Sequence, residues 1–200
     1  SNGFEGERID TSFWLSGSVT VRDDDGRRPE DGDFSGGRFV RQLGDPVLVG
    51  ESSAKRALAR LGSTKVPSGI MTMVLDNRSG GRLAGALLSP LAASAIQQRR
   101  SFLEGRAGET VGAPLLHVTD DPLIPQGFGS RHFDGEGISS RRLPLFEAGV
   151  LRNYYVDTYY GKKLNLAPTT GSTSNLDWAR GPKSQAELIA EAGDGVFVTG

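Results

Sequence analysis

The sequence predicts an α+β fold that is mainly antiparallel β-sheet with a few helices. Residues 11–21 alternate larger apolar and small polar side chains, which is the period of a half-buried strand. Residues 141–146 and 150–160 flank Glu147-Ala148-Gly149, a typical hairpin signal. Helical patterns lie between such segments, and no unit of about 20 to 50 residues recurs, so a repeat array is excluded.

The residue pattern in the first third of the chain predicts a strand, a loop and a helix in that order. Charges, glycines and Pro29 in residues 22–38 predict a long exposed loop or a loose hairpin end. A helix is expected next, capped by Ser52 or Ser53, with Ala57 on its apolar face.

A domain boundary is expected where turn-forming residues cluster in residues 62–69. We place it near residue 66, which divides the chain into segments 1–66 and 67–200.

The second segment opens with three expected elements. Residues 70–75 are short, apolar and rich in β-formers, which predicts a buried strand. Residues 83–96 repeat leucine and alanine at helical spacing, which predicts a long buried helix that Pro90 kinks or breaks. Residues 115–119 predict another short strand.

The C-terminal part continues the alternation of sheet and helix. The tyrosines of residues 154–160 suit a sheet face, and residues 161–181 suit a loop. We expect one short helix over 184–191 and a strand over 195–199. The chain starts without Met and stops on this strand-like segment, so we expect a piece of a longer protein.

Composition excludes several classes of function. The 23 Lys and Arg nearly balance the 24 Asp and Glu, giving a formal net charge of -1, so we expect no nucleic-acid partner. The chain has no Cys, which removes disulfides, thiolate metal sites and Cys nucleophiles. The longest apolar stretch is too short and too interrupted to span a bilayer, and no signal peptide opens the chain, so we expect no membrane partner and a cytoplasmic protein.

The loop over residues 127–137 is the most site-like stretch, because four glycines alternate with charged side chains. His132, Asp134 and Glu136 stand at i, i+2 and i+4, a spacing that shares one face of a strand and could present three metal ligands. The favoured interpretation is that these groups satisfy the loop backbone and neighbouring arginines. His117, among apolar neighbours, is expected to be a core or cross-strand histidine.

Other catalytic motifs are missing from the sequence. No G-x-S-x-G elbow occurs for a serine hydrolase, and neither the P-loop pattern nor G-x-G-x-x-G is met. The sequence therefore gives no support to phosphate binding or to a serine nucleophile.

Several spaced blocks carry a family resemblance over essentially the whole chain. In order they are SNGFEG, ARLGSTKVPSG, RRSFLEGRAGE, LLHVTDDPLIPQGFGSRHFDGEG, RRLPLFEAGVLRNYYVDTYYGKKL and ELIAEAGDGVFVTG. This succession resembles the TldD/PmbA family, also labelled modulators of DNA gyrase, and most of all its PmbA (TldE) branch. The resemblance implies that residues 1–66 are a central segment and residues 67–200 the first part of a barrel-like, β-rich C-terminal domain.

The resemblance also implies which residues would hold metal. The TldD branch carries H-E-x-x-x-H on the corresponding helix, where two His and a later Cys hold zinc and the Glu is the general base. Those positions fall here on Ala84, Gly85 and Ser89, which offer a methyl group, a hydrogen and a hydroxyl. We therefore expect no catalytic residue, metal or other cofactor in this chain, with zinc in a partner subunit.

The function implied is that of a non-catalytic subunit, similar to TldE/PmbA, which pairs with a TldD-type catalytic subunit in a zinc metallopeptidase that degrades or trims unfolded peptides. The peptide is expected along an exposed sheet edge. Gly129, Ser130, Asp134 and Gly137 match the family block most closely and are candidates for the peptide cleft or the subunit contact, with a turn-forming role equally open.

Two rival functions stay open. One is a stand-alone peptide-binding or scaffold protein, and the other, ranked last, is an independent hydrolase using His132, Asp134 and Glu136. Nothing in the residues supports direct contact with DNA or gyrase.

Overall fold

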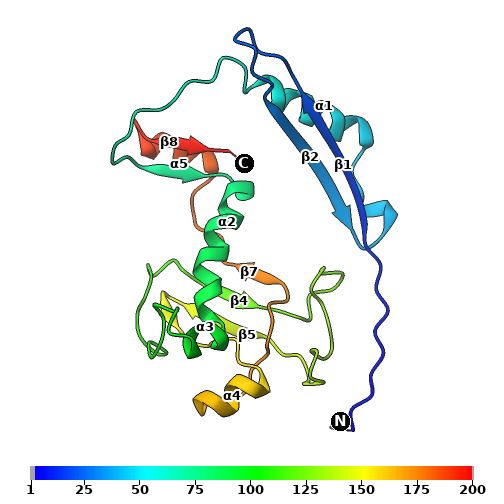
Figure 1. The fold of residues 1–200 in the computed structure, drawn as a ribbon, viewed down its shortest axis with the longest axis vertical. Helices are drawn as coiled ribbons and strands as arrows, with labels where there is room; N and C mark the ends of the chain where they lie inside the picture. Colours follow the sequence, from blue (N-terminus) through cyan, green and yellow to red (C-terminus); the bar gives the residue numbers. More distant parts are fainter. Residues whose placement is uncertain (1–2, 200) are drawn as a thin grey trace. The chain divides into compact units, whose positions relative to one another are not determined.

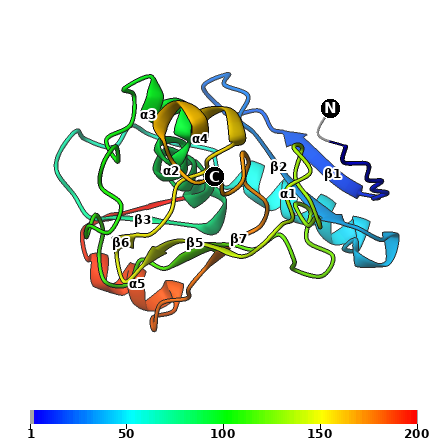
Figure 2. The same cartoon turned by 90° about the horizontal axis from the view of Figure 1, so that it is seen from below.

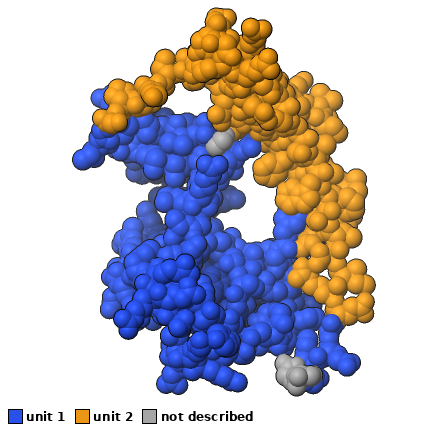
Figure 3. Space-filling view, in the orientation of Figure 1, with its two compact units in different colours: residues 1–6, 69–200 blue, residues 7–68 orange. Residues whose placement is uncertain are grey.

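The structure is a computed structural model that describes residues 3–199 (Figure 1). These residues divide into two compact units, one of residues 7–68 and a larger one of residues 3–6 and 69–199 (Figure 3). No helix in the described part of the chain is both long enough and apolar enough to cross a bilayer.

The smaller unit is a β-hairpin with one helix packed against it. Strand β1 (Phe13–Thr20) pairs antiparallel with β2 (Glu30–Gly37), in a register that runs from Phe13 opposite Gly37 to Thr20 opposite Glu30. A short 3-10 turn, η1 (Val40–Gln42), and helix α1 (Pro46–Leu58) follow. The first predicted strand is confirmed, whereas the prediction of a loop throughout residues 22–38 is wrong because β2 occupies its second half.

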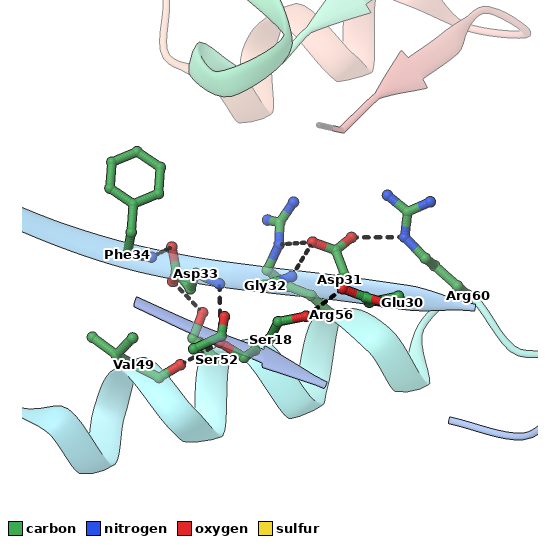
Figure 4. Close-up of polar contacts among 12 residues, drawn as sticks. Ser18, Glu30, Asp31, Gly32, Asp33, Phe34, Val49, Ser52, Arg56 and Arg60 are labelled. Atoms are coloured by element: carbon green, nitrogen blue, oxygen red, sulfur yellow. Dashed lines mark hydrogen bonds and ion pairs between the residues drawn. The ribbon is translucent and has the colours of Figure 1, made fainter. Parts of the chain in front are cut away.

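Polar contacts with α1 explain why so polar a sequence forms β2. The backbone N–H of Asp33 donates to Ser53 Oγ at 2.9 Å. Ser52 Oγ donates to Asp33 Oδ2 at 2.6 Å (Figure 4). Ser53 Oγ also lies 3.0 Å from the carbonyl oxygen of Gly17 in β1. Ser53 of the helix thus contacts both strands. These hydrogen bonds take the place of the apolar contacts that usually hold a helix against a hairpin.

Helix α1 starts earlier than predicted. Its N-cap is Asp45, whose side chain accepts a hydrogen bond from the backbone N–H of Val47 at 2.8 Å, and Pro46 follows at the first helical position. The predicted caps at Ser52 and Ser53 are wrong, since both lie inside the helix and face the hairpin.

The larger unit contains a four-stranded antiparallel sheet with the strand order β6-β5-β4-β7. Its members are β4 (Val118–Asp120), β5 (Leu143–Glu147), β6 (Val150–Leu151) and β7 (Leu176–Trp178). A second sheet pairs β3 (Met73–Leu75) with β8 (Val196–Val198) in parallel. The mixed fold with antiparallel sheet is thus confirmed. The sheets of residues 3–199 do not close on themselves, so the barrel-like form stays a prediction.

The predicted long helix is divided into three pieces. Helix α2 (Asn77–Leu88) is followed by the 3-10 turn η2 (Ser89–Leu91) and by α3 (Ala93–Gln97). The break at Pro90 is confirmed, because proline cannot continue the backbone hydrogen bonds of the helix. The expectation of burial holds only after the break: α2 has no buried residue, whereas Leu91, Ala93 and Ile96 are buried.

The core of this unit lies between the four-stranded sheet, the segment η2–α3 and the helix over Thr158–Leu164. Figure 2 shows α3 and α4 (Thr158–Leu164) together on one side of that sheet. The buried cluster is apolar and contains the following residues: Leu91, Ala93, Ile96, Leu103, Val118, Leu143, Leu145, Phe146, Leu151, Tyr154, Tyr155 and Val156.

The β5–β6 hairpin is confirmed at its predicted turn. Ala148 and Gly149 have φ angles of 50° and 76°, the left-handed pair that a tight two-residue hairpin turn requires. The strand predicted to follow is much shorter, because Tyr159 and Tyr160 belong to α4 instead of a sheet face.

Three other expectations are corrected in detail. Strand β3 is shorter than residues 70–75 and only half-buried, and β4 begins three residues later than the predicted 115–119. Strand β7 interrupts the predicted loop over 161–181. Helix α5 (Gln185–Ala192), capped by Ser184, and β8 are confirmed.

Candidate functional site

Helix α2 borders an apolar groove of about 870 Å³ in the larger unit. Trp178 of β7 lies in its wall, and the helix contributes Leu83, Ala84 and Leu87. Leu83 and Phe102 are 60% and 63% exposed, so this groove presents large apolar side chains. The full lining is Asn77, Gly80, Gly81, Leu83, Ala84, Ala86, Leu87, Phe102, Leu116 and Trp178.

The three positions that the family resemblance assigns to the metal motif lie on and just after α2. Ala84 lines the groove, and a Cβ built on Gly85 meets no atom of the described residues within 4 Å. Ser89 follows the helix, and its hydroxyl donates back to the carbonyl oxygen of Gly85 at 2.9 Å. A methyl group, a hydrogen and an internally bonded hydroxyl do not fit the nitrogen, sulfur and carboxylate ligands that zinc takes.

The predicted residues Gly129 and Ser130 are held against the segment that leads into β7. The N–H of Gly129 donates to Asn175 Oδ1 at 2.8 Å, and a Cβ at Gly129 would lie only 2.3 Å from the carbonyl oxygen of Ser174. Ser130 Oγ accepts from Asn175 Nδ2 at 2.9 Å and also contacts the carbonyl oxygen of Ile124. These contacts give both residues a positioning role inside the unit.

The predicted residues Asp134 and Gly137 form a turn. Asp134 Oδ1 accepts from the N–H groups of Glu136 and Ile138 at 2.9 and 3.0 Å. Gly137 has a φ of +79°, and the ring of Phe4 lies where its side chain would be. Their contribution to a peptide cleft or a subunit contact stays a prediction.

The structure does not bring His132, Asp134 and Glu136 together. His132 is exposed, whereas Asp134 is buried, and Glu136 accepts a hydrogen bond from the N–H of Thr158 at 2.9 Å. Among residues 3–199 no three His, Cys, Asp or Glu side chains form a group that could hold a metal ion. His117 is also exposed, and its Nδ1 accepts from the N–H of Ala148 at 3.4 Å, a cross-strand contact outside the core.

Sequence reasoning missed a buried polar network at the end of β4. Asp120 is 1% exposed and accepts hydrogen bonds from Tyr155 Oη at 2.7 Å and from the N–H and hydroxyl of Ser174. Burial, together with the hydrogen bond to Asp120, raises the pKa of the Tyr155 hydroxyl above its usual value of 10.0. The only signal in the sequence was the pair Asp120-Asp121, which also suits a strand end.

Comparisons with known proteins show the family of this chain. The sequence model of the PmbA/TldA metallopeptidase C-terminal domain matches residues 68–200. The chain is 26% identical over 184 residues to metalloprotease PmbA of Escherichia coli O157:H7, covering 91% of this chain and 41% of that protein. It is 30% identical over 181 residues to a TldD homologue of Haemophilus influenzae, covering 84% of this chain and 36% of that protein.

Solved structures of related proteins are also similar to this chain. A proposed modulator of DNA gyrase from Bacteroides thetaiotaomicron is 37% identical with a TM-score of 0.94, covering 100% of this chain and 45% of that one. TldE from Thermococcus kodakarensis, at 19% identity and a TM-score of 0.76 over 94% of this chain and 45% of that one, shares the fold. The chain belongs to the PmbA/TldD family and spans less than half the length of these relatives.

Proposed function

We propose that this chain is part of a metal-free subunit that pairs with a zinc-bearing, TldD-type subunit in a metallopeptidase for unfolded peptides. The observation that carries the proposal is the chemistry of helix α2. Ala84, Gly85 and Ser89 stand where the TldD branch has its two His and its Glu, and none of them can bind zinc or act as a general base. This subunit would therefore complete the peptide cleft without performing the hydrolysis.

An extended peptide would add to a sheet edge of this subunit. Strand β7 is an outer strand of the four-stranded sheet, and its Trp178 also lines the apolar groove beside α2. Backbone hydrogen bonds to an edge strand bind peptides with little regard to sequence, while an adjacent apolar groove favours apolar side chains. This combination suits unfolded peptides as substrates.

The test is cleavage of an unstructured peptide by the full-length protein with zinc, alone and mixed with a TldD-type subunit from the same organism. We expect cleavage only in the mixture. The control is a TldD-type subunit whose motif Glu is replaced by Gln, which should abolish cleavage by the mixture. Cleavage by the full-length protein alone would overturn the proposal, because the catalytic groups would then lie within it.

The apolar groove favours a second candidate, a stand-alone peptide-binding protein. In that case the full-length protein would bind a fluorescently labelled unstructured peptide without any partner, as measured by anisotropy. Trp178→Ala should then weaken binding about tenfold or more, the loss expected for a buried aromatic contact. Trp14→Ala is the matched control, since Trp14 is 58% exposed in the smaller unit. Peptide binding that requires the TldD-type subunit would exclude this candidate.

A further inference from the structure

A small, partly open cavity lies between the loop over residues 127–137 and the segment that leads into β7. Its volume is about 10 Å³, close to the minimum that holds one water molecule. Its polar lining includes Asp120, Arg131, Asp134, Ser140, Thr170 and Ser174. All of these residues belong to the larger unit.

Two residues of this lining carry polar atoms that no protein group satisfies. In the part of the chain that the structure describes, Arg131 Nε and Asp134 Oδ2 are buried without a hydrogen-bond partner. The first is a donor and the second an acceptor. Buried polar groups of folded proteins are nearly always hydrogen-bonded, either to protein or to ordered water, so two such atoms on residues that line one cavity point to a bound molecule.

The remaining polar groups limit what that molecule can be. Asp120 is already saturated, because its two oxygens accept from Tyr155 Oη and from the N–H and hydroxyl of Ser174. A cation in the cavity would find only one carboxylate oxygen without a partner, Asp134 Oδ2. It would also face the N–H of the Arg131 guanidinium group, whose positive charge repels it. An anion would face the carboxylates of Asp120 and Asp134 beside the guanidinium groups of Arg131 and Arg141, and a volume of about 10 Å³ leaves no room for an anion larger than one water molecule. The chemistry requires a small neutral molecule that both donates and accepts.

We propose that this cavity binds one water molecule, which accepts a hydrogen bond from Arg131 Nε and donates one to Asp134 Oδ2. The water links two parts of the fold. Arg131 also donates to the carbonyl oxygens of Ser172 and Thr173 at 2.6 and 3.1 Å, while Asp134 organises its own turn through Oδ1. The bound water thus joins the turn at Asp134 to the segment before β7, and Arg131 and Asp134 act as positioning residues.

A crystal structure of the full-length protein, grown in rubidium chloride at a resolution that shows ordered water, tests the site directly. We expect one density peak in the cavity, at hydrogen-bond distances of about 2.7 to 3.2 Å from Arg131 Nε and Asp134 Oδ2, without anomalous signal from rubidium. An anomalous peak would overturn the proposal in favour of a monovalent cation. A cavity without density would overturn it as well.

Two variants add a measurement in solution. Oxygen-17 relaxation dispersion counts long-lived internal waters, and Arg131→Lys should lower that count by one because lysine has no Nε–H at this position. Asp134→Asn should leave the count unchanged, since its amide would donate to a water that can accept two hydrogen bonds. Arg28→Lys, at an exposed arginine of the smaller unit, is the control. An unchanged count in Arg131→Lys would contradict the proposal.

Discussion

Asp31 of β2 accepts hydrogen bonds from two arginines in and just after α1. Arg56 Nε lies 3.0 Å from Asp31 Oδ1, and Arg60 Nε lies 2.7 Å from Asp31 Oδ2 (Figure 4). Burial acts to raise the pKa of Asp31, but the hydrogen bonds from Arg60 and Arg56 outweigh it and lower the pKa from 3.8 to about 2. The ionised carboxylate therefore stabilises the contact between the hairpin and the helix.

We expect Asp31→Asn to lower the free energy of unfolding by about 1 to 2 kcal/mol at pH 7, with allowance for solvent screening at the half-exposed Arg60. Because the pKa is lower in the folded state, this stabilisation is complete well above pH 3.8. It is lost as the pH falls from 3.8 toward 2. Urea unfolding of both proteins at pH 7 and in this acid range checks the result. Asp24→Asn, at an exposed loop carboxylate, should have little effect at either pH.

Gly129, a predicted site residue, packs closely against the backbone of Ser174. Gly129→Ala would force a methyl group to 2.3 Å from the carbonyl oxygen of Ser174, so we expect a loss of about 2 kcal/mol or more in the free energy of unfolding. The matched control is Gly135→Ala in the same loop, where a Cβ meets no described atom within 4 Å and the change should be small. Equal unfolding midpoints for the two variants would contradict the packing role of Gly129.

At the scale of the element, helix α1 shows that its cap and the serines that face the hairpin have different roles: the cap fixes where the helix begins, and the serines hold it against the hairpin. The sequence pattern predicted the helix but not its beginning, because the serines that looked like caps turn out to contact β2 and β1. The true cap, Asp45, precedes a proline and an apolar run, which is a signal of the right type.

Two substitutions in α1 should have opposite effects. Asp45→Ala removes the side chain that accepts from Val47 N–H and should destabilise the protein by about 1 kcal/mol. Gly50→Ala, at a helical position where a Cβ meets no described atom within 4 Å, should stabilise it by about 0.5 to 1 kcal/mol. Thermal unfolding followed by circular dichroism measures both. A loss of stability in Gly50→Ala would mean that this face of the helix is covered.

At the scale of the whole molecule, the chain passes between the two compact units twice, at Gly6–Glu7 and at Ser68–Gly69, and the second passage lies in an exposed connection. Residues 61–72 are exposed and contain no helix or strand. Such segments are the preferred sites of proteolytic cleavage.

We expect trypsin to cut the native protein first after Lys65, in this connection, and to leave the bonds after Lys55 and Arg56 of α1 intact for longer. Mass spectrometry over a digestion time course identifies the first product. Lys65→Gln should remove that product without changing the later ones. Initial cleavage inside α1, after Lys55 or Arg56, would show instead that the smaller unit opens before the connection is cut.

The sequence by itself determined the fold class, the β5–β6 hairpin, the helix break at Pro90, the short helix α5 and the family. Each of these rests on local signals or on residue order: Gly149 allows a left-handed turn, Pro90 cannot continue a helix, and Ser184 with Glu187 forms a capping box. That Ala84, Gly85 and Ser89 stand at the metal-motif positions of the family stays a prediction from the resemblance.

Only the tertiary structure decided which residues meet. It turned the polar residues 30–37 into a strand, because serines of α1 satisfy them, and it left α2 beside an open apolar groove. It separated His132, Asp134 and Glu136, and it placed Arg131 and Asp134 at one cavity. The hydrogen bond from Tyr155 to Asp120, for example, joins residues 35 positions apart. A local sequence pattern cannot predict such a contact, because it covers only neighbouring residues.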